Sequence, residues 1–185
     1  ANLAGEVIDS HTKLYKSDGF ELEFGFIPDK SEIILGEPLF AAFTVTNRSE
    51  KPYHFSDGIR GRMRDNKFRI AAVDANGQAV KDPYSYENHG GMTSPVILDK
   101  GQIYTKRLFL GNWCDFEEPG RYIVTCKRTL TGFRDKRNQP EIPIESGFTL
   151  SVEPFAQQKM WGIIAELGKR LRSGDEQSLR EATLA

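Results

Sequence analysis

The sequence predicts a mainly β protein: an antiparallel β-sandwich followed by an α-helical tail. Between residues 20 and 154, short runs of alternating apolar and polar residues are separated by turn residues, and no helical pattern interrupts them. After Pro154 the apolar period changes from two residues to about 3.6, the period of a helix with one buried face. With 185 residues, of which 38% are hydrophobic, the chain can form one core of ordinary size plus an appendage.

Residues 1–19 are expected to form a loosely attached N-terminal arm. They are polar, have few periodic apolar positions and end in the turn residues Asp18 and Gly19. The strand that follows has the clearest pattern in the sequence, because large apolar side chains occupy every second position and leave one face solvated. These side chains are Phe20, Leu22, Phe24 and Phe26.

Further strands are expected wherever this period of two returns. They cover residues 39–45, 53–55, 68–73, 96–98, 103–110, 121–130 and 148–152. The dipeptide Asn76-Gly77 tolerates the positive φ angles of a tight hairpin and places Val80 on the returning arm. Residues 82–95 are expected to form a long loop, and long loops in small domains often carry function. Short strands joined in this way pack as two antiparallel sheets, which bounds the sandwich at residues 20–154.

The tail, residues 155–185, is expected to begin with an amphipathic helix over residues 156–172. Its apolar stripe consists of Met160, Ile163, Ile164 and Leu167. This stripe must be covered by the sandwich, by following helices or by another chain, so self-association through the tail is one option. A second short helix is expected from about Glu176, which lies at capping-box spacing from Ser173.

The balance of charges argues against nucleic acid as a partner. The chain has 25 Lys and Arg against 26 Asp and Glu, a net charge of −1, so no overall positive field attracts a phosphate backbone. The most apolar tail segment is interrupted by Glu166 and Lys169, so no membrane span is expected. Ala1 is the kind of small residue that signal-peptide cleavage leaves, and a secreted or periplasmic location is therefore expected.

Two cysteines, Cys114 and Cys126, flank a turn region. Their spacing permits a disulfide without requiring one. Cys126 alternates with Tyr122 and Val124 and so faces the core, which favours an unpaired, buried thiol.

The sequence gives no sign of an enzyme. It contains no zinc-protease helix motif, no nucleophile elbow, no phosphate-binding loop and no dinucleotide fingerprint. His11, His54 and His89 are far apart and have no ligands at metal-binding spacing. We therefore expect no catalytic residues, no metal and no cofactor.

Four aromatic residues lie in loops rather than in alternating strands: Tyr84, Tyr86, Trp113 and Phe116. Exposed rings of this kind anchor protein partners or stack on sugars. The alternative is that Trp113 and Phe116 cap the end of the sandwich core, as large rings commonly do.

The segments Gly36-Glu37-Pro38, 43–47 and Pro119-Gly120-Arg121-Tyr122 resemble immunoglobulin-like modules of bacterial secreted and periplasmic proteins, with a likeness that covers about residues 20–153. This resemblance implies that Tyr122 turns its ring into the core and returns its hydroxyl to nearby backbone, as in a tyrosine corner. The segment 163–184 resembles the opening of a HEAT-type helical repeat, which implies that the tail leads into further helices.

These observations favour a noncatalytic protein-interaction or spacer module of a larger exported bacterial protein. The alternative is a carbohydrate-binding module that uses the loop aromatics. The expected partner is a protein, with a glycan as the second option.

Overall fold

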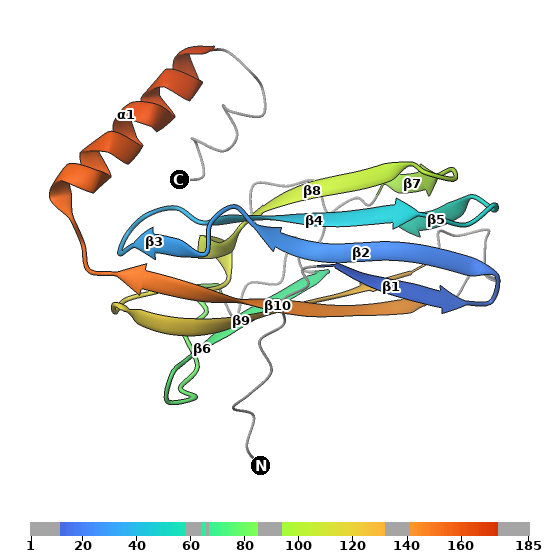
Figure 1. The fold of residues 1–185 in the computed structure, drawn as a ribbon, viewed down its shortest axis with the longest axis horizontal. Coiled ribbons are helices and arrows are strands. Elements are labelled where there is room, and N and C mark those ends of the chain that lie inside the picture. The colour runs from blue at the N-terminus through green and yellow to red at the C-terminus, as the bar shows by residue number, and fades with distance from the viewer. Residues whose placement is uncertain (1–11, 58–63, 66, 85–93, 132–140, 174–185) are drawn as a thin grey trace.

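The computed structural model describes residues 12–57, 64–65, 67–84, 94–131 and 141–173. Two four-stranded sheets lie one above the other (Figure 1). The first sheet has the order β1 (Thr12–Ser17), β2 (Phe20–Pro28), β4 (Phe40–Asn47) and β8 (Ile103–Phe109), all antiparallel. The second has the order β3 (Glu32–Ile34), β10 (Ile142–Glu153), β9 (Gly120–Leu130) and β6 (Phe68–Asp74). The predicted mainly β fold with antiparallel sheets is confirmed.

Smaller elements complete the sandwich. Strands β5 (Tyr53–Ser56) and β7 (Pro95–Leu98) form a two-stranded antiparallel ribbon. A short 3₁₀ helix (Leu110–Asn112) follows β8, and the chain continues from β10 into helix α1 (Gln157–Ser173), close to the predicted 156–172. The second helix predicted from Glu176, and the repeat that would follow it, lie outside the described residues.

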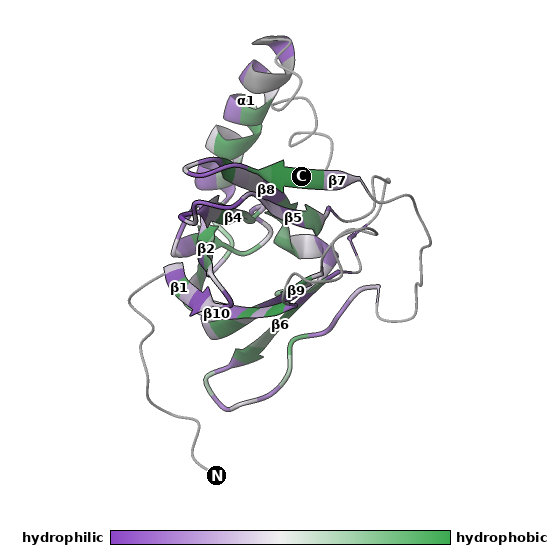
Figure 2. Cartoon of the chain, turned by 90° about the vertical axis from the view of Figure 1, so that its right-hand side faces the viewer, coloured by the Kyte–Doolittle hydropathy of each residue, from purple (hydrophilic) through white to green (hydrophobic). Residues whose placement is uncertain are grey.

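The core lies between the two sheets, which face one another in the end-on view of Figure 2. Phe26 on β2 and Phe43 on β4 both make edge contacts with Phe68 on β6, at centroid separations of 6.0 and 5.2 Å. Such T-shaped contacts add to the free energy gained by burying the rings. Phe68 thus joins the two layers at their centre.

The sandwich begins earlier than predicted. Residues 12–17, expected in the N-terminal arm, form β1 and pair with β2 in a register that runs from Thr12–Gly25 to Ser17–Phe20. Asp18 and Gly19 make the predicted turn, with φ angles of 53° and 77°. The apolar pattern is missing because β1 is an edge strand, and the side chain of Leu14 stays 53% exposed.

Strand β3 was also not predicted. It has three residues and pairs in parallel with the end of β10, from Ser151–Glu32 to Glu153–Ile34. A strand this short has no measurable period, and only its pairing partner defines it. Strand β10 itself starts at Ile142 rather than at the predicted residue 148.

Three local predictions are confirmed. Gly77 has a φ angle of 80°, and Val80 donates its backbone N–H to Ala72, so the chain returns along β6 as expected. The Tyr122 hydroxyl donates to the carbonyl oxygen of Glu118 at 2.6 Å. Cys126 is fully buried, and both it and Cys114 are unpaired thiols in this structure.

Candidate functional site

The four loop aromatics singled out in the sequence do not form a common surface among the described residues. The Trp113 side chain is buried, with 4% of the residue exposed, and its Nε1 donates to the carbonyl oxygen of Phe68 at 3.3 Å. Phe116 packs edge-on against Tyr122 at 4.9 Å. Both rings therefore pack on the core, which agrees with the alternative that they cap the end of the sandwich, and the burial of Trp113 argues against its use as a contact residue.

The burial of Trp113 follows from the 3₁₀ helix before it. The backbone N–H of Trp113 donates to Leu110, which tightens the chain at the end of β8 and turns the indole inward. Tyr84 is half-buried, and its backbone N–H donates to Asp82, which pairs with Arg64 at 2.6 Å. Tyr86 lies outside the described residues.

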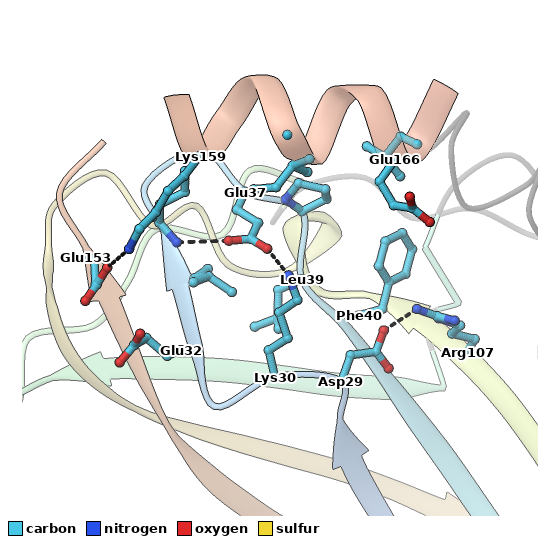
Figure 3. A pocket seen from close by; sticks show the side chains of 16 residues that line it. Asp29, Lys30, Glu32, Glu37, Leu39, Phe40, Arg107, Glu153, Lys159 and Glu166 are labelled. Carbon is cyan, nitrogen blue, oxygen red and sulfur yellow. Dashed lines mark hydrogen bonds and ion pairs between the residues drawn. The ribbon is translucent and has the colours of Figure 1, made fainter. Parts of the chain in front are cut away.

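The described part of the chain instead has a groove of about 780 Å³ between helix α1 and one end of the sandwich (Figure 3). The sandwich contributes an apolar floor from β3 and from the start of β4, and the helix contributes a facing row at i and i+4 spacing. The apolar residues that line the groove include Ile33, Leu39, Phe40, Ile163 and Leu167.

The start of β4 explains why an aromatic ring faces the groove. Phe40 points away from the core, since the inward positions of β4 are those of Ala41 and Phe43. It is nevertheless only 6% exposed, because the guanidinium of Arg107 lies 4.8 Å from its ring and Phe109 packs beside it at 5.3 Å. Phe40 is therefore a fixed part of the floor.

Glu37 holds the turn at the edge of the groove. One carboxylate oxygen accepts the backbone N–H of Ile34 at 3.0 Å, and the other pairs with Lys30. Gly36, in the same turn, has a φ angle of 85°, which glycine adopts without strain. Met160 Cε lies 3.5 Å from the place that a Cβ on Gly36 would occupy, so the turn also supports the start of the helix.

Charged side chains form the rim of the groove. Asp29 pairs with Arg107, and Glu153 pairs with Lys159 at 2.7 Å. The pKa of Lys159 is raised, first by its hydrogen bond and charge interaction with Glu153 and then by the charges of Glu32 and Glu37. Counted over the whole lining, five carboxylates face three cations, which leaves a formal charge of −2. Glu166 also lies 3.8 Å from Lys169, which is outside this lining, so the rim is close to charge balance.

The apolar stripe of α1 is only partly covered. Of the predicted residues, Met160, Ile163 and Leu167 are half-buried on the side of the sandwich, whereas Ile164 is 49% exposed. Trp161 is 62% exposed, and Phe155, just before the helix, is 59% exposed. Neither aromatic fits the apolar stripe predicted from the helical period, and their exposure therefore does not follow from that stripe, although both lie in the tail.

Other exposed apolar side chains are dispersed. Leu14, Ile27, Ile97, Ile103 and Ile123 lie on five different strands, β1, β2, β7, β8 and β9. Single exposed aliphatic residues are normal on protein surfaces. In the tail, by contrast, three large exposed apolar side chains lie within ten residues of one another: Phe155, Trp161 and Ile164.

A second charged cluster is structural. Lys106 binds Asp57 at 3.1 Å and Asp65 at 2.7 Å, and this joins β8 to the segment after β5. Arg128, 2% exposed, lies 4.5 Å from the centre of the Phe68 ring and donates from Nη2 to the carbonyl oxygen of Ser56 at 3.0 Å. Burial, and next the charge of Arg128, lower the pKa of Lys67.

Two absences hold for the described residues, 12–57, 64–65, 67–84, 94–131 and 141–173. No group of three His, Cys, Asp or Glu side chains within these ranges is placed to hold a metal ion. No helix in the same ranges is long and apolar enough to cross a membrane.

No protein-family model and no curated protein sequence matches the chain. Among solved structures, it is similar to a β-glucosidase from Listeria innocua in complex with gluconolactone, with 16% identity and a TM-score of 0.41 over 77% of this chain and 17% of that one. It is also similar to the β-glucosidase EmGH1 from Erythrobacter marinus, with 14% identity and a TM-score of 0.35 over 71% of this chain and 15% of that one.

A third similar structure is AvmM, which is described as catalysing macrocyclization in alchivemycin A biosynthesis. It has 12% identity and a TM-score of 0.33, and the match covers 78% of this chain and 98% of AvmM. The chain spans only 17% of the first glucosidase. Likenesses of this strength assign neither a family nor an activity.

Proposed function

We propose that this chain is a noncatalytic protein-interaction module of a larger exported protein, and that the outer face of α1 is its contact surface. The observation that carries the proposal is the exposure of Trp161, Ile164 and Phe155 on one short segment. Each such side chain gains roughly 1.5–3 kcal/mol when it is fully buried. Large aromatic residues are also enriched among the residues that dominate binding energy at protein interfaces.

The width of the apolar sector of α1 supports this proposal. Ile163 and Leu167 face the sandwich, whereas Trp161 and Ile164, three residues apart, share the other side of the helix. A helix that is apolar on two sides is typical of an element packed between two bodies. The sandwich is one body, and a partner protein supplies the second.

The immunoglobulin-like character of the sandwich and the reading of the tail as the start of helical repeats belong to the same proposal. The bond from Tyr122 to Glu118 supports the first, because this bond is a feature of such sandwiches. The exposed apolar side chains of the amphipathic helix α1 support the second, since neighbouring helical repeats cover one another's apolar faces.

Carbohydrate binding through the loop aromatics loses its main support. Sugar stacking needs exposed flat rings, whereas Trp113 is in the core and Phe116 packs on Tyr122. Of the three rings that the structure describes, the half-buried Tyr84 is the one left as a candidate for sugar stacking.

Site-specific photo-crosslinking tests the proposal. A benzophenone amino acid is placed at position 161 of the intact protein in its own cells, and at position 123 as the control. Ile123 is 49% exposed on β9, far along the chain from the tail. We expect one discrete protein adduct from position 161 and none from position 123, and the purified adduct partner should bind saturably. Equal or absent adducts at both positions would refute the proposed contact surface.

A further inference from the structure

We infer that the partner at the outer face of α1 is a second copy of this chain, whose own α1 packs antiparallel to the first about a two-fold axis. The Trp161 side chain of each copy then lies over Gly168 of the other. This inference rests on the proposed function, because it names the partner at the same face.

The side of α1 that faces away from the groove combines large and small residues. Trp161, Ile164, Ala165 and Gly168 are not among the residues that line the groove, and they share a sector of about 100° on the opposite side of the helix. Trp161 is 62% exposed, whereas a Cβ on Gly168 would meet no atom within 4 Å. This outer face therefore has a projecting indole and, two turns later, an open notch at the glycine. Helix α1 itself projects from one end of the sandwich (Figure 1).

The spacing of these residues is that of a seam between two paired helices. Trp161, Ile164 and Gly168 follow one another at three and four residues, the repeat at which helices pack side by side with a crossing angle of about 20°. In an antiparallel pair that sets Trp161 opposite Gly168 of the other copy, Ile164 lies opposite Ala165. Each large side chain therefore meets a small one, and the two halves of the contact are identical.

Other arrangements fill this surface less well. A parallel pair sets Trp161 against Trp161 and Gly168 against Gly168, so the two indoles hold the helices apart and a gap is left at the glycines. A flat surface of an unrelated protein covers the indole but does not fill the notch. A second copy supplies both a projecting indole and a notch at matching places.

The charges on the helix agree with the antiparallel arrangement. The four residues of the seam are uncharged, so the two copies meet there without opposed like charges. The same register sets the exposed Arg172 opposite Gln157, whose side-chain carbonyl can accept a hydrogen bond from a guanidinium. In a parallel pair, Arg172 would instead lie at the same level as Arg172 of the other copy, where the two cations repel.

The size of the contact predicts a weak dimer. A helix of 17 residues is about 25 Å long, and a single strip of this length buries less than the roughly 1,200 Å² of a stable complex. The dimer should therefore dissociate on dilution into monomers that are stable by themselves. This agrees with a core that, within the described residues, does not include Trp161.

A reciprocal exchange of residues locates the contact. The dissociation constant of the dimer is measured by analytical ultracentrifugation of the full chain over a range of concentrations. Trp161→Gly removes the projecting indole and Gly168→Trp fills the notch, so each single variant should raise this constant at least about tenfold. The double variant has the composition of the parent and again sets each indole opposite a glycine. It should therefore regain a dissociation constant within about threefold of the parent value.

Gly162→Trp is the matched control for Gly168→Trp. Gly162 lies in the same helix on the side of the groove, and a Cβ there also meets no atom within 4 Å. This variant should leave the dissociation constant of the dimer unchanged. A chain that is monomeric at every concentration, a Gly168→Trp variant that dimerises like the parent, or a double variant as weak as the single ones would overturn the inference.

Crosslinking from position 161 separates this inference from the proposed function. An adduct of twice the mass of the protein supports both. An adduct with an unrelated protein retains the proposed contact surface and refutes the second copy as its partner. Absence of any adduct from position 161 refutes the contact surface itself.

Discussion

The hydroxyl of Tyr122 donates to the backbone carbonyl oxygen of Glu118, four residues earlier, at 2.6 Å. Pro119 and Gly120 lie between the two residues, so the bond closes the turn that starts β9. Tyr122 itself is 5% exposed and packs on Phe116. The Tyr122 side chain and the turn thus fix one another.

Tyr122→Phe should lower the free energy of unfolding by about 1 kcal/mol, the usual contribution of an intramolecular hydrogen bond. The ring, and with it the apolar packing, is retained. Urea titration followed by fluorescence measures the difference, with Tyr122→Leu as the comparison that also removes the ring. A loss well below half a kcal/mol in Tyr122→Phe would contradict this role of the hydroxyl.

Lys106→Met should be destabilising, because it leaves Asp65, with a side chain only 4% exposed, without its ion-pair partner. The pair is partly buried, so its loss should cost about 1–3 kcal/mol. The matched control is Lys127→Met, which breaks the exposed pair with Glu145 and should cost at most about 1 kcal/mol. Similar unfolding midpoints for the two variants would show that the Lys106 cluster does not hold the segment after β5.

Alkaline pH should destabilise the fold through its two buried thiols. Burial raises the pKa of Cys114 to about 12, and that of Cys126 further, with a smaller contribution from the charge of Cys114. The unfolded chain loses these protons first, from about pH 8.5, so each thiol lowers stability by up to about 1.4 kcal/mol per pH unit above that value.

The loss of stability begins when the pH rises above the thiol pKa of the unfolded chain, and it ends only when the pH passes the thiol pKa of the folded protein. Burial likewise raises the pKa values of Tyr53 and Tyr104, which adds to the effect from about pH 10. Urea titrations between pH 7 and pH 10 should show the decline, and Cys114→Ala with Cys126→Ala should flatten its first part. A stability that stays constant up to pH 10, or a mass that reveals a disulfide, would contradict the prediction.

Gly162→Ala should stabilise α1. Glycine within a helix costs roughly 0.5–1 kcal/mol relative to alanine, and a Cβ at this position meets no atom within 4 Å. Amide hydrogen exchange at the centre of α1 should slow by about two- to fivefold. Gly77→Ala is the opposing control: its Cβ also has free space, but its φ angle of 80° makes alanine unfavourable there. Faster exchange in Gly162→Ala would be the contrary result.

The sequence was sufficient to predict strands that bury one face. β2, β4, β6 and β9 have an alternating pattern because one side of each lies on the core. β1 lies at a sheet edge with exposed side chains, and β3 is defined only by its pairing with β10. Neither leaves a periodic pattern in its own residues, so no local analysis could find them.

The candidate site was predictable only in part. The helix and its stripe follow from the spacing of Met160, Ile163 and Leu167, but the covered part of the stripe depends on where the chain leaves β10. The groove combines residues 29–40, 107 and 153–167, and only the tertiary fold brings these together. Trp113 illustrates the same limit for a loop residue. Its position in a loop is compatible both with capping the core and with exposure, and the sequence alone does not decide between them.

The most direct test of the account is the affinity of the partner identified from position 161 for a double variant of the outer helix face, Trp161→Ala with Ile164→Ala. Both side chains are about half or more exposed, so the melting temperature should stay within a few degrees of the parent value. Calorimetric titration should show a dissociation constant raised at least about tenfold, since exposed aromatic anchors dominate such interfaces. A double variant that is equally stable and binds as tightly as the parent would contradict the central claim that this face of α1 is the contact surface.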